Sequence, residues 1–319
     1  MFRSIWEDVK REFSYGNMVT RIIIINIIAF VAINLIWIFF RISHGWETPE
    51  LYYSIRNFFM ISSDWLHNLT HPWALITHMF LHESFWHILW NMLFLYWFGR
   101  IVGDFIGNHR ILPLYLLGGL FASLIYFVSS AIIPYAQGEV HYALGASGAV
   151  MAIVVASGVI SPDYIMRLFL LGDVKLKYIV ATLVFLDLIG IASNSNTGGA
   201  FAHLGGAFFG WLFVRQLREG SDWSVPVNRF IERINNFFRG ISEERQRPKK
   251  GPRVVYRNTG KTRPQRRARG NQAASDSGTP GAMSHQEQLD AILDKIKKSG
   301  YDSLSEEEKE FLFNASKKN

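Results

Sequence analysis

Uncharged, apolar stretches recur along the first 217 residues of this chain. The clearest lies between Arg21 and Arg41, where 19 consecutive residues carry no charge. A helix of that length extends roughly 28 Å, which is enough to cross the hydrocarbon core of a bilayer. The pattern therefore predicts an all-α polytopic membrane protein with six transmembrane helices. The other five stretches are residues 84–99, 111–133, 146–160, 178–192 and 201–217.

The charges between these stretches alternate from one loop to the next. The segment before residue 22 and the loops at 100–110 and 161–177 carry Lys and Arg, whereas residues 134–145 and 192–200 carry neither. Short loops rich in Lys and Arg resist translocation. We therefore predict a multi-pass protein of the cell (inner) membrane. Both termini are expected in the cytoplasm, and the two loops without Lys or Arg on the external or periplasmic side.

The composition divides the chain at the same place. Residues 1–217 hold twelve basic and twelve acidic side chains, so the net charge of +7 belongs entirely to residues 218–319. A neutral apolar block followed by a basic polar block argues against a single soluble globule. The chain contains no Cys, which excludes a disulfide scaffold and a zinc site built on thiolates.

These blocks suggest four segments. Residues 1–19 form an amphipathic segment, interpreted either as an interfacial helix on the inner leaflet or as a helix packed on the domain. Residues 20–217 form the membrane domain. Residues 218–282 form a basic, largely disordered cytoplasmic linker. Residues 283–319 form a short C-terminal helical hairpin, opened by a capping-box pattern at Ser284 and Glu287 and continued by a second helix from Ser303 or Ser305.

The linker and the hairpin each suggest partners. Residues 245–270 contain 11 Lys and Arg and no acid, which favours contact with anionic lipid or plain solvation beside the bilayer. Nucleic acid is disfavoured as a partner because the run lacks regularly placed aromatic side chains for stacking bases. Two short helices bury too little surface to be stable alone, so we expect the hairpin to dock on a protein partner, either another copy or the membrane domain.

A His-Glu pair at the start of the second apolar stretch first suggests a zinc protease. That chemistry requires HExxH, which places two His side chains four residues apart on one helical face. Here His82 and His87 are five residues apart, about 140° around a helix. The metalloprotease interpretation therefore fails on spacing, and we expect neither a metal nor a cofactor.

Four other polar groups are predicted at one depth in the membrane. His87 and Asn91 share a helical face, Ser147 lies in the segment Gly145-Ala146-Ser147-Gly148, and His203 begins the last predicted span. These three spans run in the same direction, so their first turns lie near the same surface. Taken singly, each residue is better explained by helix packing or an interhelical hydrogen bond than by catalysis. Four of them on three helices are harder to explain in that way, because polar groups inside a membrane are costly.

The sequence resembles a rhomboid intramembrane serine protease between about residues 73 and 217. The resemblance rests on the segments HMFLHESFWHILWNMLFLYWFG, GASG and AHLGGAFFG, which occur in this order on alternate spans. It implies that Ser147 is the nucleophile and His203 the general base of a dyad, and that His87 and Asn91, with the Ser147 N–H, form the oxyanion hole. It also implies that the substrates are transmembrane proteins.

Glycines around the predicted site have a packing interpretation. Gly206 and Gly210 form a GxxxG step that would let the fourth and sixth spans approach closely, and Gly145 and Gly148 flank the Ser. A bulky residue at Gly206 is expected to separate the dyad. No acid is obviously available to orient His203, which fits a dyad. Asp187, toward the outer end of the fifth stretch, is the one candidate for a third catalytic member, and we favour a structural hydrogen bond for it instead.

Three positions depart from the rhomboid pattern. Ala74 follows Trp73 where the family usually has Arg, which leaves the anchoring of this loop open. Gly103 replaces an acidic residue near the inner end of the second span, and Met151 replaces an aromatic one turn after the nucleophile.

Three functions follow from these observations. The first is an intramembrane serine endopeptidase that hydrolyses peptide bonds in or next to transmembrane helices. The alternative is a catalytically inactive rhomboid-like factor that binds membrane proteins, although such relatives lose the Ser or the His. A small-solute channel or transporter would require inverted repeats or a charged pathway, and neither is visible.

Overall fold

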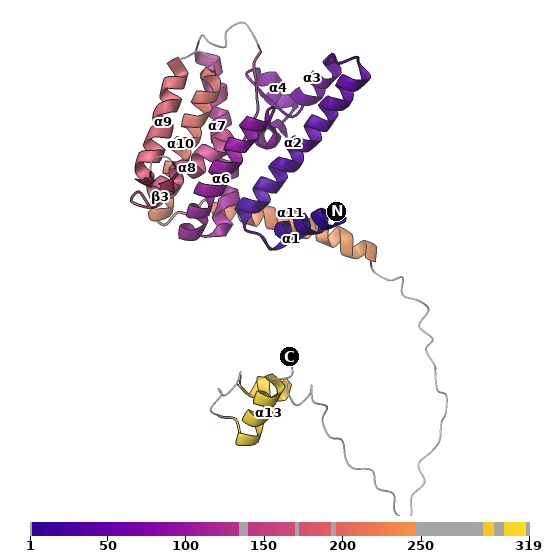
Figure 1. Ribbon diagram of the computed structural model, residues 1–319, viewed down its shortest axis with the longest axis vertical. Helices are drawn as coiled ribbons and strands as arrows, with labels where there is room; N and C mark the ends of the chain where they lie inside the picture. Colours follow the sequence, from indigo (N-terminus) through magenta and orange to yellow (C-terminus); the bar gives the residue numbers. More distant parts are fainter. Residues whose placement is uncertain are drawn as a thin grey trace, which may run out of the picture. The chain divides into compact units, whose positions relative to one another are not determined.

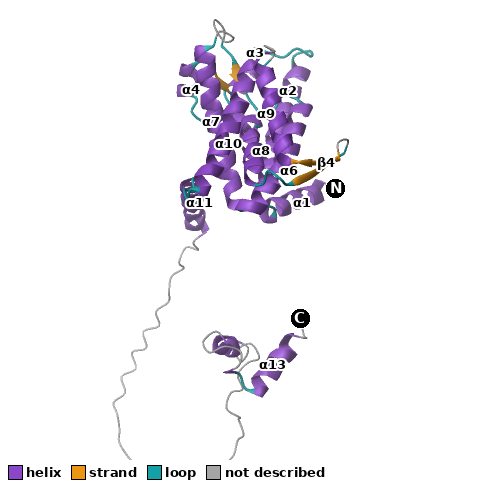
Figure 2. Cartoon of the chain, turned by 90° about the vertical axis from the view of Figure 1, so that its left-hand side faces the viewer, coloured by secondary structure: helices purple, strands orange, loops and turns teal. Residues whose placement is uncertain are grey.

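The structure is a computed structural model that describes residues 2–133, 140–169, 172–192, 196–246, 290–296 and 303–316. The chain divides into two compact units, Met1–Lys249 and Lys250–Asn319, each described by itself below. The first unit is mostly helical (Figures 1 and 2). Its long apolar helices are α2 (Met18–Ser43), α6 (Phe85–Ile106), α7 (Ile111–Ile132), α8 (Ser147–Ile160), α9 (Leu176–Ala192) and α10 (Thr197–Arg218).

Helix α8 forms the centre of this unit. It contacts α6, α7, α9 and α10, and every residue from Gly148 to Ser157 is buried. Its sequence, SGAVMAIVVASGVI, is apolar on all sides, which is typical of a helix surrounded by others rather than one at a surface. Small residues on α7, α8 and α10 permit this close approach. The helix that begins with Ser147 is therefore held from several directions.

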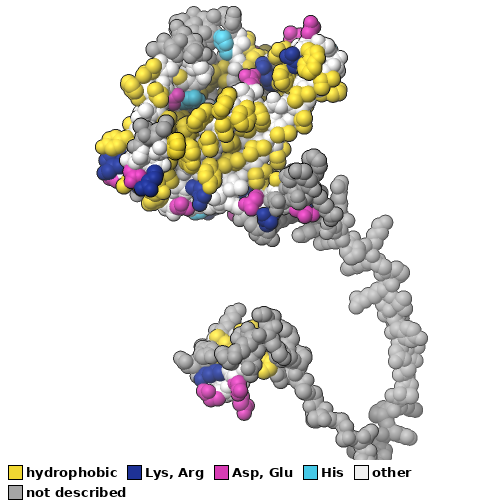
Figure 3. All heavy atoms as spheres, in the orientation of Figure 1, with side chains coloured by type: hydrophobic (Ala, Val, Ile, Leu, Met, Phe, Trp, Pro, Cys, Tyr) yellow, Lys and Arg dark blue, Asp and Glu magenta, His cyan; other side chains and the backbone are white. Residues whose placement is uncertain are grey.

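Within the described residues, three helical segments are long and apolar enough to cross a membrane: Met18–Ser43, Asn108–Ile132 and Thr197–Arg218. Ser147–Ile160 is a shorter apolar helix. Hydrophobic side chains cover the middle of the helical unit, and most charged side chains lie toward its two ends (Figure 3). This is the distribution expected of a protein whose middle part lies in the hydrocarbon core of a bilayer. The count of six crossings remains a prediction.

Two short two-stranded sheets connect loops of the first unit. Strand β1 (Ile61–Ser62) pairs antiparallel with β2 (Tyr142–Ala143), and β3 (Ile165–Leu168) pairs antiparallel with β4 (Gly172–Lys175). The first sheet joins the long loop after α2 to the segment that precedes Ser147. That loop also contains α3 (Glu50–Asn57), α4 (Trp65–Thr70), α5 (Ala74–Thr77) and the 3₁₀ turn η1 (His78–Phe80), and a second 3₁₀ turn, η2 (Asn108–Arg110), precedes α7.

The loop is anchored without an Arg after Trp73. The indole N–H of Trp73 donates to the Phe58 carbonyl at 2.8 Å, and the two rings lie 4.6 Å apart. Ala74 is fully buried. The Thr77 hydroxyl donates to the Phe59 carbonyl at 2.8 Å. These contacts supply the anchoring that the sequence left open.

Two amphipathic helices flank the apolar ones. Helix α1 (Phe2–Tyr15) covers most of the predicted N-terminal segment, and several side chains of its apolar stripe lie outside the described part. Helix α11 (Ser224–Gln246) occupies the first part of the segment predicted as a largely disordered linker, and that prediction is wrong for these residues. Phe230, Ile234 and Phe237 recur at helical spacing there. Asp222, just before α11, is paired with Arg110 at 2.7 Å.

The second unit contains two described helical segments, residues 290–296 and α13 (Glu306–Ser316). The second begins with a reciprocal cap: Glu308 N–H donates to the Ser305 hydroxyl at 3.3 Å, and Ser305 N–H donates to the Glu308 carboxylate at 2.8 Å. Lys295 pairs with the same carboxylate at 2.8 Å. The predicted cap at Ser284 and Glu287 lies outside the described residues, as does most of the predicted linker.

Candidate active site

The four polar residues singled out in the sequence line one cavity. It has a volume of about 1650 Å³, and its walls include Ser147, His203, His87 and Asn91. It lies at the end of the helical unit where α6, α8 and α10 begin. Exposed apolar side chains of α6 and α9, including Trp86, Trp90 and Leu186, form part of its wall. The other polar lining residues are Arg56, Glu83, Tyr126, His141, Tyr142, Asp187, Asn196 and Thr197.

Ser147 is the first residue of α8. The first N–H groups of a helix have no acceptor within the helix, and the N-terminal end of the helix dipole is positive. The hydroxyl of Ser147 thus lies beside backbone donors that suit a developing negative charge. Gly145, two residues earlier, has a φ of +126° that an L-side chain rarely adopts. This conformation lets the chain turn from β2 into the helix.

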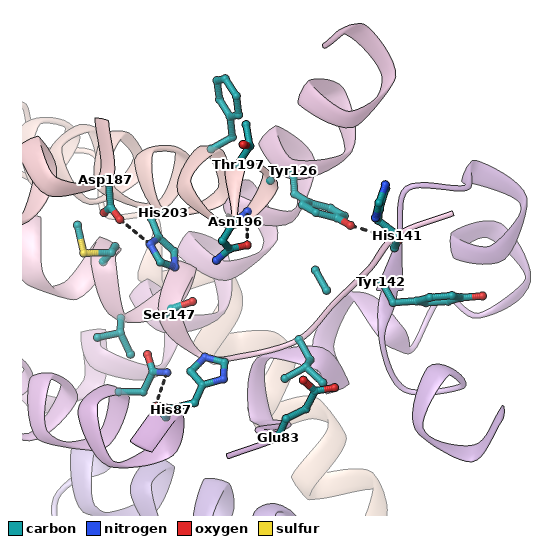
Figure 4. A pocket seen from close by; sticks show the side chains of 18 of the residues that line it. Glu83, His87, Tyr126, His141, Tyr142, Ser147, Asp187, Asn196, Thr197 and His203 are labelled. Carbon is teal, nitrogen blue, oxygen red and sulfur yellow. Dashed lines mark hydrogen bonds and ion pairs between the residues drawn. The ribbon is translucent and has the colours of Figure 1, made fainter. Parts of the chain in front are cut away.

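His203 lies in the second turn of α10, and its ring is turned toward Ser147 (Figure 4). Its Nδ1 is 2.8 Å from the Asp187 carboxylate on α9. Both side chains are mostly buried, with 24% of His203 and 19% of Asp187 exposed. Sequence reasoning named this acid as a structural hydrogen-bonding group, and the hydrogen bond is present with the predicted base as its partner.

His87 lies on the other side of Ser147 from His203 (Figure 4). Asn91 is one turn further along α6 and lines the same cavity. The Asn91 side-chain amide donates to the His87 carbonyl at 2.9 Å, which leaves its second N–H available. A β-carbon built on Gly145 would meet the His87 ring at 2.8 Å and the Ser147 hydroxyl oxygen at 3.7 Å. The His87 ring and the Ser147 hydroxyl therefore face the same small volume.

Glycines on α10 bring its backbone against α8. A β-carbon on Gly206 would collide with the Gly148 main chain, and one on Gly210 would collide with the Ala152 main chain. On α8, a β-carbon on Gly148 would lie within about 2.5 Å of Ala122 on α7. These close approaches hold the first turn of α8 against α10, at a point one turn after His203.

Sequence reasoning missed the hydrogen bonds that fix the segment before Ser147. His82 was considered only as a zinc ligand, yet its ring accepts from the Ala146 N–H at 3.4 Å. The carbonyl of His78 accepts from the Gly145 N–H at 2.9 Å, and its ring contacts the Ser123 hydroxyl at 3.1 Å. Burial lowers the pKa of His82 to about 3 and that of His78 to about 4, so both rings stay neutral. Spacing alone could not distinguish these supporting His residues from His87.

Comparison with known proteins identifies the domain. Residues 69–219 match the family model described as Rhomboid domain. Residues 283–318 match a second model, described as a family of unknown function, DUF6576. Residues 69–219 therefore match a rhomboid domain, which confirms the resemblance drawn from the sequence.

Curated relatives carry the same family name. The chain is 31% identical over 186 residues to RHOMBOID-like protein 12, mitochondrial, of Arabidopsis thaliana, covering 55% of this chain and 54% of the relative. It is 28% identical to the human presenilin-associated rhomboid-like protein, mitochondrial, covering 53% and 43%. It is 25% identical to rhomboid protein 1, mitochondrial, of Saccharomyces cerevisiae, covering 53% and 47%. The chain thus matches about half the length of these relatives.

The relatives correct one prediction. The sequence placed the protein in the cell (inner) membrane, with cytoplasmic termini and a site opening to the external or periplasmic side. The relatives are named as mitochondrial proteins, which contradicts this assignment to the cell (inner) membrane. The physical reason for the error is that the Lys and Arg bias groups the loops by side but does not encode which membrane receives the protein.

Proposed function

We propose that this protein is an intramembrane serine endopeptidase that hydrolyses peptide bonds in or next to transmembrane helices of other proteins. The match of residues 69–219 to the rhomboid domain supports this class of reaction, because rhomboid proteases act on transmembrane substrates. The observation that carries the proposal is that Ser147, His203, His87 and Asn91 line a single cavity. A hydroxyl, an imidazole and amide donors are the groups that acyl transfer requires.

The reaction proceeds in two acyl-transfer steps. His203 Nε2 takes the proton of the Ser147 hydroxyl as that oxygen bonds to the substrate carbonyl carbon. When the C–N bond breaks, the same proton passes to the leaving amine, which leaves an ester on Ser147. Water then attacks this ester and gives one proton to His203. The proton returns to Ser147 as the new carboxyl terminus departs, so the enzyme is regenerated.

The oxyanion of each tetrahedral intermediate is stabilised by the Ser147 N–H, the Asn91 amide and the His87 ring. One such side-chain donor typically contributes about 10²–10³-fold in rate. The apolar wall formed by Trp86, Trp90 and Leu186 suits an apolar segment of the substrate. Its peptide bond must leave a helix first, because helical hydrogen bonds and side chains shield it.

The finer architecture is part of the same proposal. Six helices cross the membrane, α2 and α6–α10, with both termini on one side and the cavity opening near the other. Residues after α11 form a basic linker that contacts anionic lipid, and the C-terminal hairpin docks on a protein partner. Residue segments 1–19, 20–217, 218–282 and 283–319 remain the proposed domains, with α11 as the helical start of the third.

The test uses the full chain purified in detergent with a helical transmembrane substrate. Cleavage by the wild type and its loss in Ser147→Ala and His203→Ala are expected. A serine-directed fluorophosphonate should label the wild type and neither variant. Equal cleavage by Ser147→Ala would overturn the proposal. Wild type that neither cleaves nor labels would favour the inactive membrane-protein-binding factor instead.

A further inference from the structure

Asp187 makes an unusual contact for an acid in an apolar helix. Its carboxylate Oδ1 lies 2.8 Å from Nδ1 of His203 (Figure 4), and its neighbours Phe185, Leu186 and Leu188 are exposed on the outside of α9. An ionisable group in such a segment is costly, so its retention calls for a partner or a function. Among the described side chains, His203 is its hydrogen-bonding partner.

The chemistry of the contact fixes the proton on the ring. An ionised carboxylate has no hydrogen and only accepts, so Nδ1 of His203 must donate. A neutral imidazole that carries its proton on Nδ1 has a free lone pair on Nε2. That lone pair is what a general base needs in order to take the hydroxyl proton of Ser147. Without the acid, the ring would divide between the two tautomers and could rotate.

The negative charge of Asp187 is opposite in sign to the positive charge that develops on the His203 ring. When the ring accepts the Ser147 proton it becomes an imidazolium, and an anion at hydrogen-bond distance stabilises it. His87 on α6 is also titratable and lines the same cavity as His203, but it is a base and adds no negative charge. Arg56 and Glu83 lie elsewhere on the cavity wall and pair with each other at 2.8 Å. Asp187 is thus the acid whose carboxylate contacts His203 in the described chain.

We propose that Asp187 is a positioning residue of the active site, which holds His203 in the Nδ1–H tautomer and stabilises its protonated form during catalysis. The unit is then Ser147-His203-Asp187 on α8, α10 and α9. This inference rests on the proposed protease function. The competing interpretation is that the bond serves only to fasten α9 to α10.

The experiment compares Asp187→Asn and Asp187→Glu with wild type in the full chain. Asp104→Asn is the matched control, because Asp104 is an exposed acid near the C-terminal end of α6, the end away from His87. For Asp187→Asn we expect kcat to fall by at least about tenfold, a part of the roughly 10²–10⁴-fold that general-base catalysis contributes, with KM little changed. We expect Asp187→Glu to recover part of the rate and Asp104→Asn to match wild type.

The pH–rate profile distinguishes a role of Asp187 in positioning His203 from a role in holding α9 against α10. Loss of the anion disfavours the protonated ring, so the acid-side midpoint of kcat/KM in Asp187→Asn should move to lower pH. A variant that merely loosens α9 would lower the rate or the thermal stability and leave this midpoint in place. An unmoved midpoint, or a rate within twofold of wild type, would overturn the inference.

A readout that needs no activity keeps this inference separate from the proposed function. Nitrogen NMR of ¹⁵N-His protein, with the His203 signals assigned through His203→Gln, reports the tautomer directly. A single Nδ1–H form in wild type and a mixture in Asp187→Asn would support the positioning role even in a protein that cleaves nothing. The same mixture in both proteins would overturn it. Failure of Ser147 to react, by contrast, counts only against the protease function.

Discussion

Gly206 of α10 lies directly against the main chain of Gly148 of α8. A β-carbon on Gly206 would be 2.9 Å from the Gly148 carbonyl carbon and nearer still to its oxygen. Gly148 follows Ser147, and Gly206 lies one turn after His203. The contact between two glycines therefore sets how closely the predicted nucleophile and base approach each other, because main-chain atoms cannot move aside as a flexible side chain can.

Gly206→Ala should consequently destabilise the protein and reduce its activity. We expect a loss of about 1–3 kcal/mol from overpacking and a fall in cleavage rate of about 100-fold as the dyad separates. Gly103→Ala is the control, since the nearest atom to its β-carbon is 3.9 Å away. That substitution should stabilise by about 0.4–1 kcal/mol. Thermal unfolding in detergent and substrate cleavage measure both, and equal effects of the two variants would refute the packing argument.

Gly145→Ala tests the turn that leads into α8. The residue has a φ of +126°, and its added methyl group would lie 2.8 Å from the His87 ring. Gly172 in the β3–β4 hairpin also has a positive φ, +72°, with nothing within 4 Å of its β-carbon. Both substitutions should cost about 1–2 kcal/mol in backbone strain. Only Gly145→Ala should abolish cleavage in a protein that still unfolds cooperatively, and comparable activity in the two would contradict this role.

The buried rings of His78 and His82 predict a loss of stability in acid. Burial lowers their pKa values to about 4 and about 3, whereas His in an unfolded chain titrates near 6.5. Below about pH 6.5 the unfolded chain binds more protons than the folded one, so the free energy of unfolding should fall as the pH drops toward 4.

His78→Gln should reduce the slope of the free energy of unfolding against pH, because Gln does not titrate. The exposed His109 supplies the control variant His109→Gln, which should leave the slope unchanged. Chemical unfolding in detergent between pH 4 and pH 7.5 gives the measurement. A slope that is the same in wild type and His78→Gln would show that this ring is not the source.

The absence of Cys makes the membrane topology simple to test. Single replacements Glu47→Cys, Asp173→Cys and Ser221→Cys, all at exposed positions, provide one thiol each on an unreactive background. With six crossings, an impermeant maleimide applied to sealed vesicles should react with Glu47→Cys from one side, and with the other two variants only from the opposite side. Labelling of Glu47→Cys and Ser221→Cys from the same side would exclude six crossings.

The sequence was sufficient for the features that depend on local pattern. Apolar stretches located the long helices to within a few residues, although the end of α6 extends seven residues beyond its predicted stretch, to Ile106. The five-residue spacing of His82 and His87 excluded a metalloprotease. The segments around His87, Ser147 and His203 together gave the rhomboid resemblance. Helix α11 was missed because the net basic charge of the tail concealed the helical spacing of Phe230, Ile234 and Phe237.

Only the tertiary structure decided which polar residues meet. Asp187 and His203 are 16 positions apart and on different helices, so their contact at 2.8 Å follows from how α9 packs beside α10. The supporting positions of His78 and His82 likewise depend on the loop that pairs β1 with β2. Hydropathy and spacing determine that a helix forms and which residue types it presents. The distance between two side chains on separate helices depends on packing of every element between them, and no single segment encodes it.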